Sequence, residues 1–524
     1  MPTGEVESFA LLIVMSSGGV PKMKGGKPMR RILPLLALAL SLCLPSVSRA
    51  DVRALLIACS DFVTQPDLGS AISGNVQMIA SALLGVSPRI AGLSIEDGTI
   101  GTGDALDASI AGAFAEADED DLSILYLCTH GVLSSSDDGL AYLLLSDGET
   151  ESALSGSDLC RMLSSIQGDK LVILDACFSG ALIGRGTLPR PVPAGESAAL
   201  PRPVGEHAVQ AAAPFLADTS IHLLTSASGF ESSWYYDSQS LATGAISYFA
   251  SALSSGLGLY GVPEADMDGD AQISLRELHA YLSAAVPSSS CQLLSADDTL
   301  TLPAVSSAML TRPLSGFSYG ESLLMADSPE LDFSFTVTDQ TAVQYRLIDF
   351  DSGKWNWEGA KTFLDEGDQG DGMLSPGRKT RTLTLSDVAP GDSGYLMLQV
   401  FSLSGDELIL CSERLIAVQP AEGDAQLSLS CPEAFASDRE ELCIAVTTGV
   451  PAELTVSVYD AQGSLVRRIC QSRLTRPAPG DITPVYWDGR DQRGVRVPEG
   501  YYTVTAEASI SGRRYRATAD VRAF

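Results

Sequence analysis

His130 and Cys177 are the two residues of this sequence whose types and surroundings best suit covalent chemistry. Each follows an apolar run, residues 122–127 for His130 and residues 171–174 for Cys177. Apolar runs of this length, separated by helical patterns, predict buried parallel strands whose carboxyl ends meet at one edge of a sheet. A thiol and an imidazole at the same edge can perform acyl transfer, with Cys177 attacking and His130 moving protons.

A purely structural role is the alternative for both residues. Isolated cysteines are commonly small buried hydrophobes, and isolated histidines are commonly hydrogen-bonded in a core. Here both stand in motifs that contain glycine, His130-Gly131 and Cys177-Phe178-Ser179-Gly180, and this favours catalysis. The remaining three histidines compete less well, since they lie in a Pro-rich loop, a strand pattern and a helical pattern: His207, His222 and His279.

The two motifs together resemble those of the caspase, metacaspase and clostripain clan of cysteine peptidases. The resemblance rests on His-Gly after one buried strand, Asp-Ala-Cys-x-Ser-Gly after the next, and a separation of 47 residues, close to the roughly 50 noted for caspases. It covers about residues 51–305. It implies that Cys177 is the nucleophile, that His130 protonates the leaving amine, and that the backbone N–H groups of Gly131 and Cys177 bind the oxyanion.

The same resemblance assigns substrate specificity to Asp175. In metacaspase-like members, the Asp two residues before the nucleophile lines the pocket for the residue before the scissile bond, where a carboxylate would pair with Arg or Lys. The second acidic position of the family, in an Asn-Asp pair, is replaced by Gly74-Asn75, and Asn75 is expected to line the same pocket. We therefore expect cleavage after basic residues. A structural hydrogen-bonding role at the strand end is the alternative for Asp175.

An acidic segment of twelve residues, 266–277, has the spacing of an EF-hand calcium loop. Side chains that carry oxygen occupy positions 1, 3, 5, 7, 9 and 12, and Ile273 occupies the anchoring position 8. The pattern departs at position 6, where Ala271 replaces the usual glycine and must adopt a left-handed conformation at some cost. We expect a structural or regulatory Ca²⁺, and a solvated acidic turn that caps the next helix is the alternative. The expected ligands are Asp266, Asp268, Asp270, Gln272, Ser274 and Glu277.

Alternating strand and helix patterns over residues 51–312 predict an α/β domain with a mostly parallel sheet flanked by helices, and the resemblance implies that this domain is caspase-like. Residues 184–217 are expected to form a flexible loop, because they are rich in Pro, Ala and Gly and repeat Leu-Pro-Arg-Pro-Val. In caspase-like zymogens the corresponding segment is a processing linker. Two of its three arginines precede proline, which blocks most peptidases, so self-cleavage is expected after Arg185.

From residue 313 onwards, strand patterns and turn signals alternate without a long helical pattern. They predict two all-β Ig-like sandwich domains, at about 313–420 and 421–524. Within the second, residues 458–467, 487–494 and 497–502 resemble the immunoglobulin-like domain of the flagellar hook-capping protein class, called FlgD-like, a common appendage of secreted bacterial proteins. Trp487 is expected in the core of that sandwich, and no catalytic role follows from the domain.

Residues 1–50 are predicted to be a signal peptide, with Met23 or Met29 as alternative starts. Arg30-Arg31 precede an apolar stretch at 32–44, and a small-x-small pattern ends at Ala50. The stretch is shorter than the roughly 20 residues that cross a bilayer, and no later segment is long enough either. We therefore expect a secreted or extracytoplasmic protein without a membrane span.

The composition narrows the function further. The formal net charge is −31, and it becomes −35 without residues 1–50, which hold six basic and two acidic residues. A surface this acidic repels nucleic acid, so protein or peptide substrates are the expected partners. Nine cysteines remain beyond residue 50, an odd number that leaves at least one thiol unpaired within the chain.

The sequence thus predicts a secreted cysteine-type endopeptidase that uses a His–Cys dyad and binds calcium. The alternatives are a catalytically inactive caspase-like adhesion or scaffold protein, and a transpeptidase that uses the same dyad. The sequence leaves the oligomeric state open.

Overall fold

The computed structural model describes most of the chain from Asp51 onwards. The described residues are 51–86, 90–133, 141–184, 205–229, 231–235, 247–260, 263–286, 289–303, 313–327, 329–351, 354–356, 358–385, 393–404, 407–420, 426–437, 441–475, 482–510 and 512–524. The predicted signal peptide at residues 1–50 and the predicted processing residue Arg185 lie outside them.

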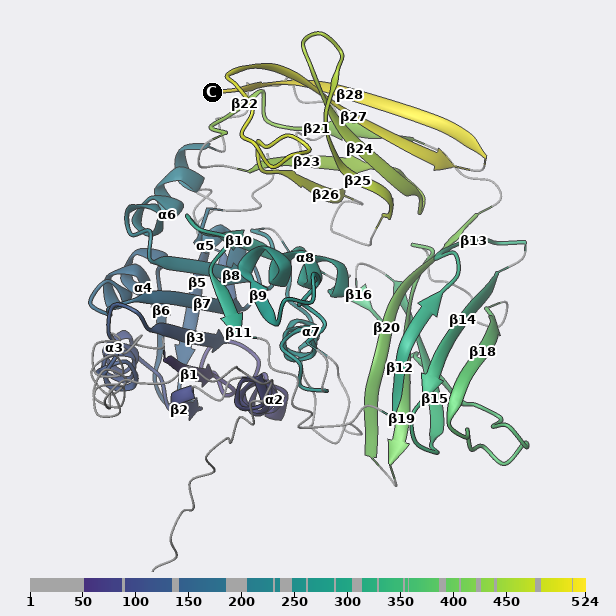
Figure 1. Ribbon diagram of the computed structural model, residues 1–524, viewed down its shortest axis with the longest axis horizontal. Helices are drawn as coiled ribbons and strands as arrows, with labels where there is room; N and C mark the ends of the chain where they lie inside the picture. The colour runs from purple at the N-terminus through teal and green to yellow at the C-terminus, as the bar shows by residue number, and fades with distance from the viewer. Residues whose placement is uncertain are drawn as a thin grey trace, which may run out of the picture. The chain divides into compact units, whose positions relative to one another are not determined.

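A six-stranded sheet forms the centre of the first part of the chain (Figure 1). Its strands lie in the order β10-β8-β7-β3-β1-β2, and every neighbouring pair is parallel except β10 with β8. The predicted α/β class with a mostly parallel sheet is therefore confirmed. The strand bounds are Val52–Ala58 for β1, Ile90–Asp97 for β2, Leu122–Cys128 for β3, Asp169–Asp175 for β7, Ile221–Thr225 for β8 and Gln292–Leu294 for β10.

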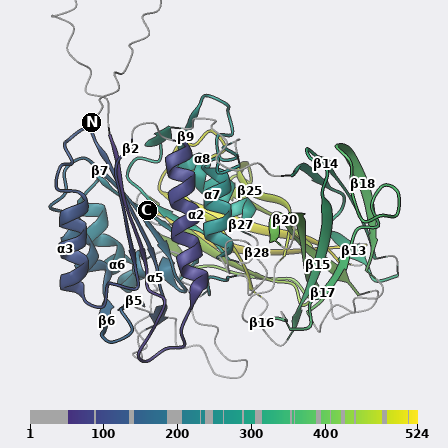
Figure 2. The same ribbon diagram turned by 90° about the horizontal axis from the view of Figure 1, so that it is seen from below.

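Helices cover both faces of this sheet, as Figure 2 shows. Helices α2, α7 and α8 contribute to the apolar cluster on one face, and α3, α4 and α6 contribute to the cluster on the other. The strands are apolar on both sides for this reason: Leu56 belongs to the first cluster and its neighbour Leu55 to the second. The helix bounds are Ser70–Val86 for α2, Gly103–Ala113 for α3, Gly156–Leu163 for α4, Gly205–Ala217 for α6, Tyr248–Gly256 for α7 and Leu275–Ala285 for α8.

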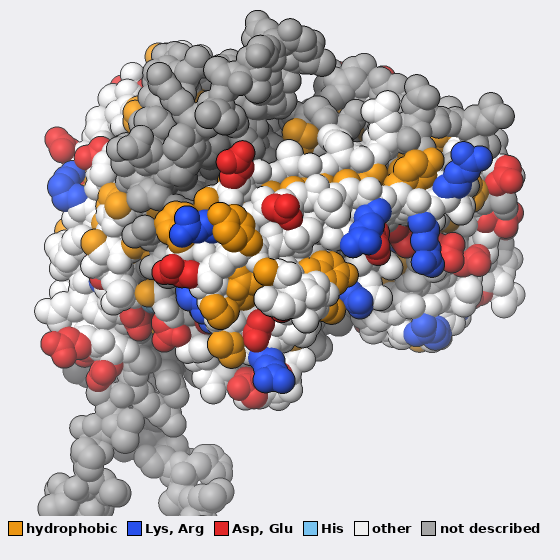
Figure 3. All heavy atoms as spheres, turned by 90° about the horizontal axis from the view of Figure 1, so that it is seen from above, with side chains coloured by type: hydrophobic (Ala, Val, Ile, Leu, Met, Phe, Trp, Pro, Cys, Tyr) orange, Lys and Arg blue, Asp and Glu red, His pale blue; other side chains and the backbone are white. Residues whose placement is uncertain are grey.

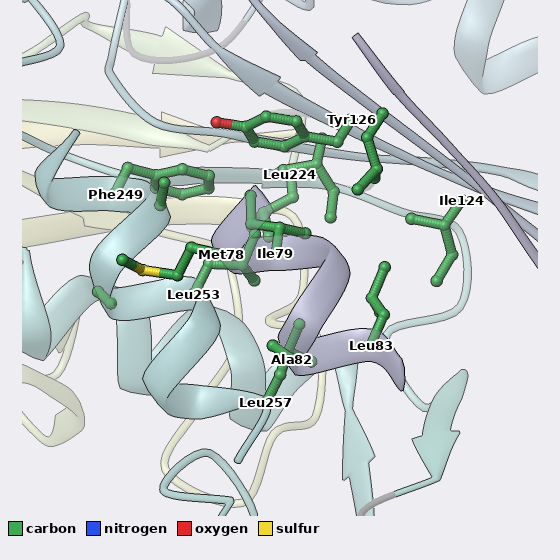
Figure 4. Close-up of a cluster of buried hydrophobic side chains, with 14 of the residues drawn as sticks. Met78, Ile79, Ala82, Leu83, Ile124, Tyr126, Leu224, Phe249, Leu253 and Leu257 are labelled. Atoms are coloured by element: carbon green, nitrogen blue, oxygen red, sulfur yellow. The ribbon is translucent and has the colours of Figure 1, made fainter. Parts of the chain in front are cut away.

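The packing of α2 on the sheet positions one of the candidate site residues. Ile79 and Leu83 of α2 are buried in the same cluster as Ile124 and Tyr126 of β3 (Figure 4). Residues four apart lie on the same face of a helix, so Asn75 is on this buried face one turn before Ile79. The apolar contacts of α2 therefore hold Asn75 next to the carboxyl end of β3.

Serine or threonine begins four of the helices. Thr102, Ser155, Ser247 and Ser274 each accept a hydrogen bond from the backbone N–H three residues later, at the starts of α3, α4, α7 and α8. Such caps satisfy N–H groups that have no partner inside the helix. Ser274 and Glu277 form a reciprocal capping box at α8.

The prediction of one flexible loop over residues 184–217 is wrong for its second part. Residues 205–217 form α6, whose Ala212 and Phe215 are buried against the sheet. Burial of these apolar side chains outweighs the unfavourable composition of the segment, which includes Pro214 inside the helix. Residues 185–204 lie outside the described part of the chain.

Several short elements lie outside the main sheet. A three-stranded antiparallel sheet joins β4 (Gly131–Leu133), β5 (Ala141–Ser146) and β6 (Glu151–Leu154). The four-residue helix α5 (Ser179–Leu182) follows β7. Strands β9 (Gln272–Ser274) and β11 (Thr301–Pro303) pair beside α8.

From residue 313 onwards, every regular element of the described residues is a strand, as predicted. Two sheets, β12-β14-β18 and β13-β20-β19-β15-β16 with β17 paired to β15, precede two more, β21-β23-β26 and β22-β28-β27-β24-β25. Trp487 is 1% exposed within the apolar cluster of the second pair of sheets, which agrees with its predicted core role. On the face of the molecule shown in Figure 3, acidic, basic and apolar side chains are intermixed.

The strands of these four sheets are β12 (Leu314–Tyr319), β13 (Leu323–Met325), β14 (Glu330–Val337), β15 (Ala342–Asp351), β16 (Lys354–Trp355), β17 (Lys361–Leu364), β18 (Gly377–Thr384), β19 (Tyr395–Ser404), β20 (Glu407–Gln419), β21 (Ser428–Ser430), β22 (Ala434–Phe435), β23 (Leu442–Thr447), β24 (Glu453–Asp460), β25 (Leu465–Leu474), β26 (Ile482–Trp487), β27 (Gly500–Ile510) and β28 (Arg513–Ala523).

All nine cysteines beyond residue 50 are described and are free thiols. In the described ranges, no helix combines the length and the apolarity needed to cross a bilayer.

Candidate active site

The structure places His130 and Cys177 at the same edge of the main sheet. Strands β3 and β7 are parallel neighbours, and their last residues, Cys128 and Asp175, are register partners. The pairing continues for one more step, since Thr129 N donates to Asp175 O at 3.3 Å. His130 and Cys177 therefore leave adjacent strands side by side, each two residues beyond a strand end.

Gly131 touches the backbone of the predicted nucleophile. A Cβ atom built on Gly131 would lie 1.7 Å from Cys177 O and 2.7 Å from Cys177 C. Real Cβ atoms essentially never approach other heavy atoms within 3.0 Å. Only glycine fits at position 131, and the two segments that follow the strands meet through their backbones, where the family resemblance expects the oxyanion to bind.

A backbone carbonyl holds the ring of His130. Nε2 of His130 lies 2.8 Å from Pro66 O, and the ring of Phe62 lies 4.5 Å from the imidazole, centroid to centroid. Because a carbonyl only accepts, Nε2 must carry the hydrogen, and the neutral ring then has its lone pair on Nδ1. Pro66 and Phe62 belong to the segment between β1 and α2, where no sequence pattern marks them as site residues.

Cys177 is poised as a protonated thiol. Its Sγ lies 3.7 Å from Ser233 O, and burial raises the pKa of the thiol above its usual value. Between these two described side chains, Cys177 and His130, there is no hydrogen bond. The thiol is therefore protonated at neutral pH and is not paired with the imidazole in this structure.

Ser226, Ala227 and Glu231 hold the loop that carries Cys177. Ser226 Oγ accepts from Ala176 N at 3.1 Å, and Ala227 O accepts from Gly180 N at 3.0 Å. Between them, Phe178 has φ 57° and donates its N–H to Glu231 O at 2.8 Å. A left-handed conformation at a bulky residue is strained and persists only when its surroundings enforce it. The strain lies directly after Cys177, as expected for a nucleophile held in an exact orientation.

Asp175 and Asn75, the two predicted substrate-binding residues, belong to one buried polar cluster. Ser247 joins them, because its N–H donates to Asn75 Oδ1 at 2.8 Å and its hydroxyl donates to Asp175. Asp175 also accepts hydrogen bonds of 2.9 Å from Tyr126 and from Ser233. Burial raises the pKa of Asp175, and the hydroxyl donors oppose that shift.

No cation neutralises Asp175 in the described part of the chain. The side chain is 3% exposed and its partners are hydroxyl groups. Hydroxyl donors satisfy the carboxylate oxygens but leave their charge uncompensated, which is costly at this depth. Asn75 is 1% exposed, and its Nδ2 donates a hydrogen bond to Cys128 Sγ at 3.3 Å.

The predicted calcium loop brings three of its six expected ligands together. The carboxylates of Asp266, Asp268 and Asp270 lie within 4.8 Å of one another. Ala271 adopts φ 66°, the left-handed conformation expected at position 6, and donates its N–H to Asp266 at 3.1 Å.

The other three expected ligands make different contacts. Gln272 accepts a hydrogen bond from the Thr301 hydroxyl at 2.8 Å, and Ser274 and Glu277 form the capping box of α8. The hydrogen bonds from Ser274, together with those from the backbone of Asp268 and Met267, lower the pKa of Glu277. The ionised Glu277 thus reaches back across the loop, with Asp268 N 3.3 Å from its Oε1.

Comparisons with known proteins agree with both resemblances seen in the sequence. Residues 31–189 match the CHAT domain family, which belongs to the caspase-like clan, and both His130 and Cys177 lie within this match. Residues 438–512 match the FlgD Ig-like domain family. No curated protein matches the chain.

Among solved structures, caspase-1 from Spodoptera frugiperda is similar, with 13% identity and a TM-score of 0.29. The similarity covers 47% of this chain and 89% of that protein. The family matches confirm the two predicted resemblances: this chain is similar to the CHAT family of the caspase-like clan over residues 31–189 and to the FlgD Ig-like family over residues 438–512.

Proposed function

We propose that this protein is a cysteine-type endopeptidase in which Cys177 is the nucleophile and His130 transfers protons. The observation that carries the proposal is the contact between the backbones of Gly131 and Cys177 at one sheet edge. It is supported by the hydrogen bond of His130 Nε2 to Pro66 O, which leaves Nδ1 as the proton acceptor. This arrangement lies at the carboxyl edge of the sheet, where a substrate can bind, which favours a catalytic histidine over a structural core histidine.

The proposed reaction has two halves. Nδ1 of His130 takes the proton from Cys177 Sγ, and the thiolate attacks the scissile carbonyl carbon, so that the carbonyl electrons form an oxyanion beside the Gly131 and Cys177 backbone. His130 then gives the proton to the leaving amine as the C–N bond breaks, and a thioester remains. Water, deprotonated by His130, attacks the thioester and releases the acid and the free thiol.

Digestion of a peptide library tests the proposal. Cys177→Ala should abolish cleavage, and His130→Ala should lower kcat/KM by about 100-fold or more, the usual size of a general acid–base contribution. Cys431→Ala, which removes another partly exposed thiol, is the matched control and should cleave at the wild-type rate. Cleavage by purified Cys177→Ala protein would eliminate the assignment. A wild type that cleaves nothing, with Cys177 inert to alkylation at neutral pH, would favour the inactive scaffold.

We propose further that the peptidase cleaves after Arg or Lys, and that Asp175 provides the counter-charge. The supporting observation is a buried carboxylate whose partners are all hydroxyl groups, because a substrate cation would supply the missing charge. Asp175→Asn should weaken cleavage of basic substrates more than of neutral ones. A library that shows preference for Asp or for a large apolar residue would reject this specificity.

Calcium is proposed as a structural or regulatory ion of the loop 266–277. The clustered carboxylates of Asp266, Asp268 and Asp270 suit an oxygen-seeking divalent ion, and their mutual repulsion would be relieved by binding it. Ligand binding to the folded state raises its apparent stability, so millimolar CaCl₂ should raise the melting temperature. Asp268→Asn should remove the increase, whereas Asp371→Asn, in a different acidic loop, should keep it. An unchanged wild-type melting curve in the presence of calcium would count against calcium binding at this loop.

An extracytoplasmic location is proposed from the signal pattern in residues 1–50. The mature protein should then begin at Asp51. Expression with fractionation and N-terminal sequencing would test this, and a cytoplasmic protein that retains residues 30–50 would refute it.

A further inference from the structure

One carboxylate anchors the segment that holds the ring of His130. Glu151, the first residue of β6, accepts hydrogen bonds from Val63 N at 2.9 Å and from Thr64 N at 3.1 Å. It also accepts a hydrogen bond from the hydroxyl of Thr64. Two residues further along the same segment, Pro66 O receives the Nε2–H of His130. The chain of contacts therefore runs from β6 through the tip of this segment to the imidazole.

We propose that Glu151 is a positioning residue for His130: by binding Val63 and Thr64 it keeps the Pro66 carbonyl on Nε2 and so presents Nδ1 to Cys177. This inference rests on the proposed peptidase function and adds to it a residue that touches neither substrate nor nucleophile. Glu151 lies 21 residues after His130 in sequence, in β6, whereas His130 lies between β3 and β4.

The remaining contacts of the segment lie at its base and beside its tip, where Phe62 N donates to Asp67 Oδ1 at 2.8 Å and the Phe62 side chain is buried. Leu68 N donates to Ser60 O at 2.8 Å, and the Ser146 hydroxyl donates to Asp61 O at 2.6 Å. Within the tip itself, the side chain of Val63 is 57% exposed and residues 64–66 are exposed, so no side chain of residues 63–66 is anchored in the apolar core. Without the carboxylate, the tip would lose three hydrogen bonds at once, two of them from backbone N–H groups.

Electrostatics support the same arrangement. Partial burial raises the pKa of Glu151, but the hydrogen bonds from Thr64 and Val63 and the charge of His130 outweigh it, and the net pKa is lowered. Glu151 is therefore ionised at neutral pH and can accept from all three donors. An ionised acceptor makes stronger hydrogen bonds than a neutral one, which suits a residue that must hold an exposed loop tip.

The tautomer of His130 tests the anchor without reference to activity. In Cys177→Ala protein labelled with ¹⁵N-histidine, the signals of His130 are identified by their loss in His130→Gln. We expect the neutral ring to be the Nε2–H tautomer, fixed by Pro66 O. Glu151→Gln should convert it into a mixture of both tautomers. Glu149→Gln removes an equal charge from an exposed residue of the same hairpin and should leave the tautomer unchanged.

Kinetics test whether the anchor matters for the reaction. Glu151→Gln should lower kcat by about 10-fold or more, because misplacing a catalytic group by about 1 Å costs up to roughly 100-fold. KM should stay within about twofold, since Glu151 touches no substrate. Thr64→Val removes one of the three hydrogen bonds and should cause a smaller loss. Combined with Glu151→Gln it should add little further loss, because both changes remove the same contact.

Two results would contradict the proposal that Glu151 positions His130. The first is a Glu151→Gln protein in which His130 keeps the pure Nε2–H tautomer, whatever its activity. The second is an equal loss of kcat in Glu149→Gln, which would show that net charge alone is responsible. A wild type without peptidase activity would refute the proposed function, and the tautomer measurement would still decide whether Glu151 positions His130.

Discussion

Replacing Gly131 by alanine is expected to displace the backbone of Cys177, the proposed nucleophile. The added Cβ would lie 1.7 Å from Cys177 O, whereas real Cβ atoms keep at least 3.0 Å from other heavy atoms. The two backbone segments must therefore separate by the difference, about 1.3 Å. Neither contact is with a flexible side chain, so no rotamer change can relieve the overlap.

The expected losses follow from this displacement. A misplacement of about 1 Å at a reacting group can cost roughly 100-fold in rate, so kcat/KM of Gly131→Ala should fall by at least about 100-fold. Overpacking of a close contact typically costs about 1–3 kcal/mol, and the free energy of unfolding should fall by that amount. The rate should therefore suffer far more than the stability.

Peptide cleavage and urea unfolding measure the two losses. Gly112→Ala is the matched control, because Gly112 lies in α3 and a Cβ there meets nothing within 4 Å. It should keep wild-type kcat/KM and gain up to about 1 kcal/mol, since alanine suits a helix better than glycine. A Gly131→Ala protein with wild-type kcat/KM and an unchanged unfolding midpoint would refute the reasoning, because it would mean that the two backbones do not meet.

Three further predictions concern other parts of the chain. Burial lowers the pKa of His222 from 6.5 in the folded state, so the unfolded state binds a proton at His222 more readily. The stability that neutral His222 contributes is therefore present above pH 6.5 and is lost as the pH falls below 6.5. Urea midpoints at pH 7.5 and 5.0 should show this loss, and an equal loss in His222→Gln would contradict it. Incubation should cut after Arg185 in the wild type but not in Cys177→Ala, and N-terminal sequencing that finds cleavage in both would refute self-processing. Arg381→Ala should lower the free energy of unfolding by about 1–3 kcal/mol, because it leaves the buried Asp365 without its bidentate partner at 2.6 and 3.0 Å. Arg378→Ala, which loses only a hydrogen bond to Ser334, should cost less, and equal losses would contradict this account.

Local sequence patterns were sufficient to predict the α/β class and the shared edge of His130 and Cys177. Both depend on apolar runs that mark buried strands and on the residues that directly follow them. The left-handed Ala271 and the buried Trp487 were also predictable from local patterns. The spacing of the calcium loop and the apolar pattern of the β-rich domain can each be recognised from a few neighbouring residues.

Only the tertiary structure decided the contacts between distant segments. No sequence pattern links Pro66 with His130, or Ser247 with Asp175 and Asn75, and the proximity of Gly131 and Cys177 was expected only from the family resemblance. A backbone carbonyl is chemically alike at every position, and serine is common, so residue type does not identify these groups. The helix at 205–217 was missed for a related reason: Ala212 and Phe215 gain stability from a sheet whose position the segment itself does not encode.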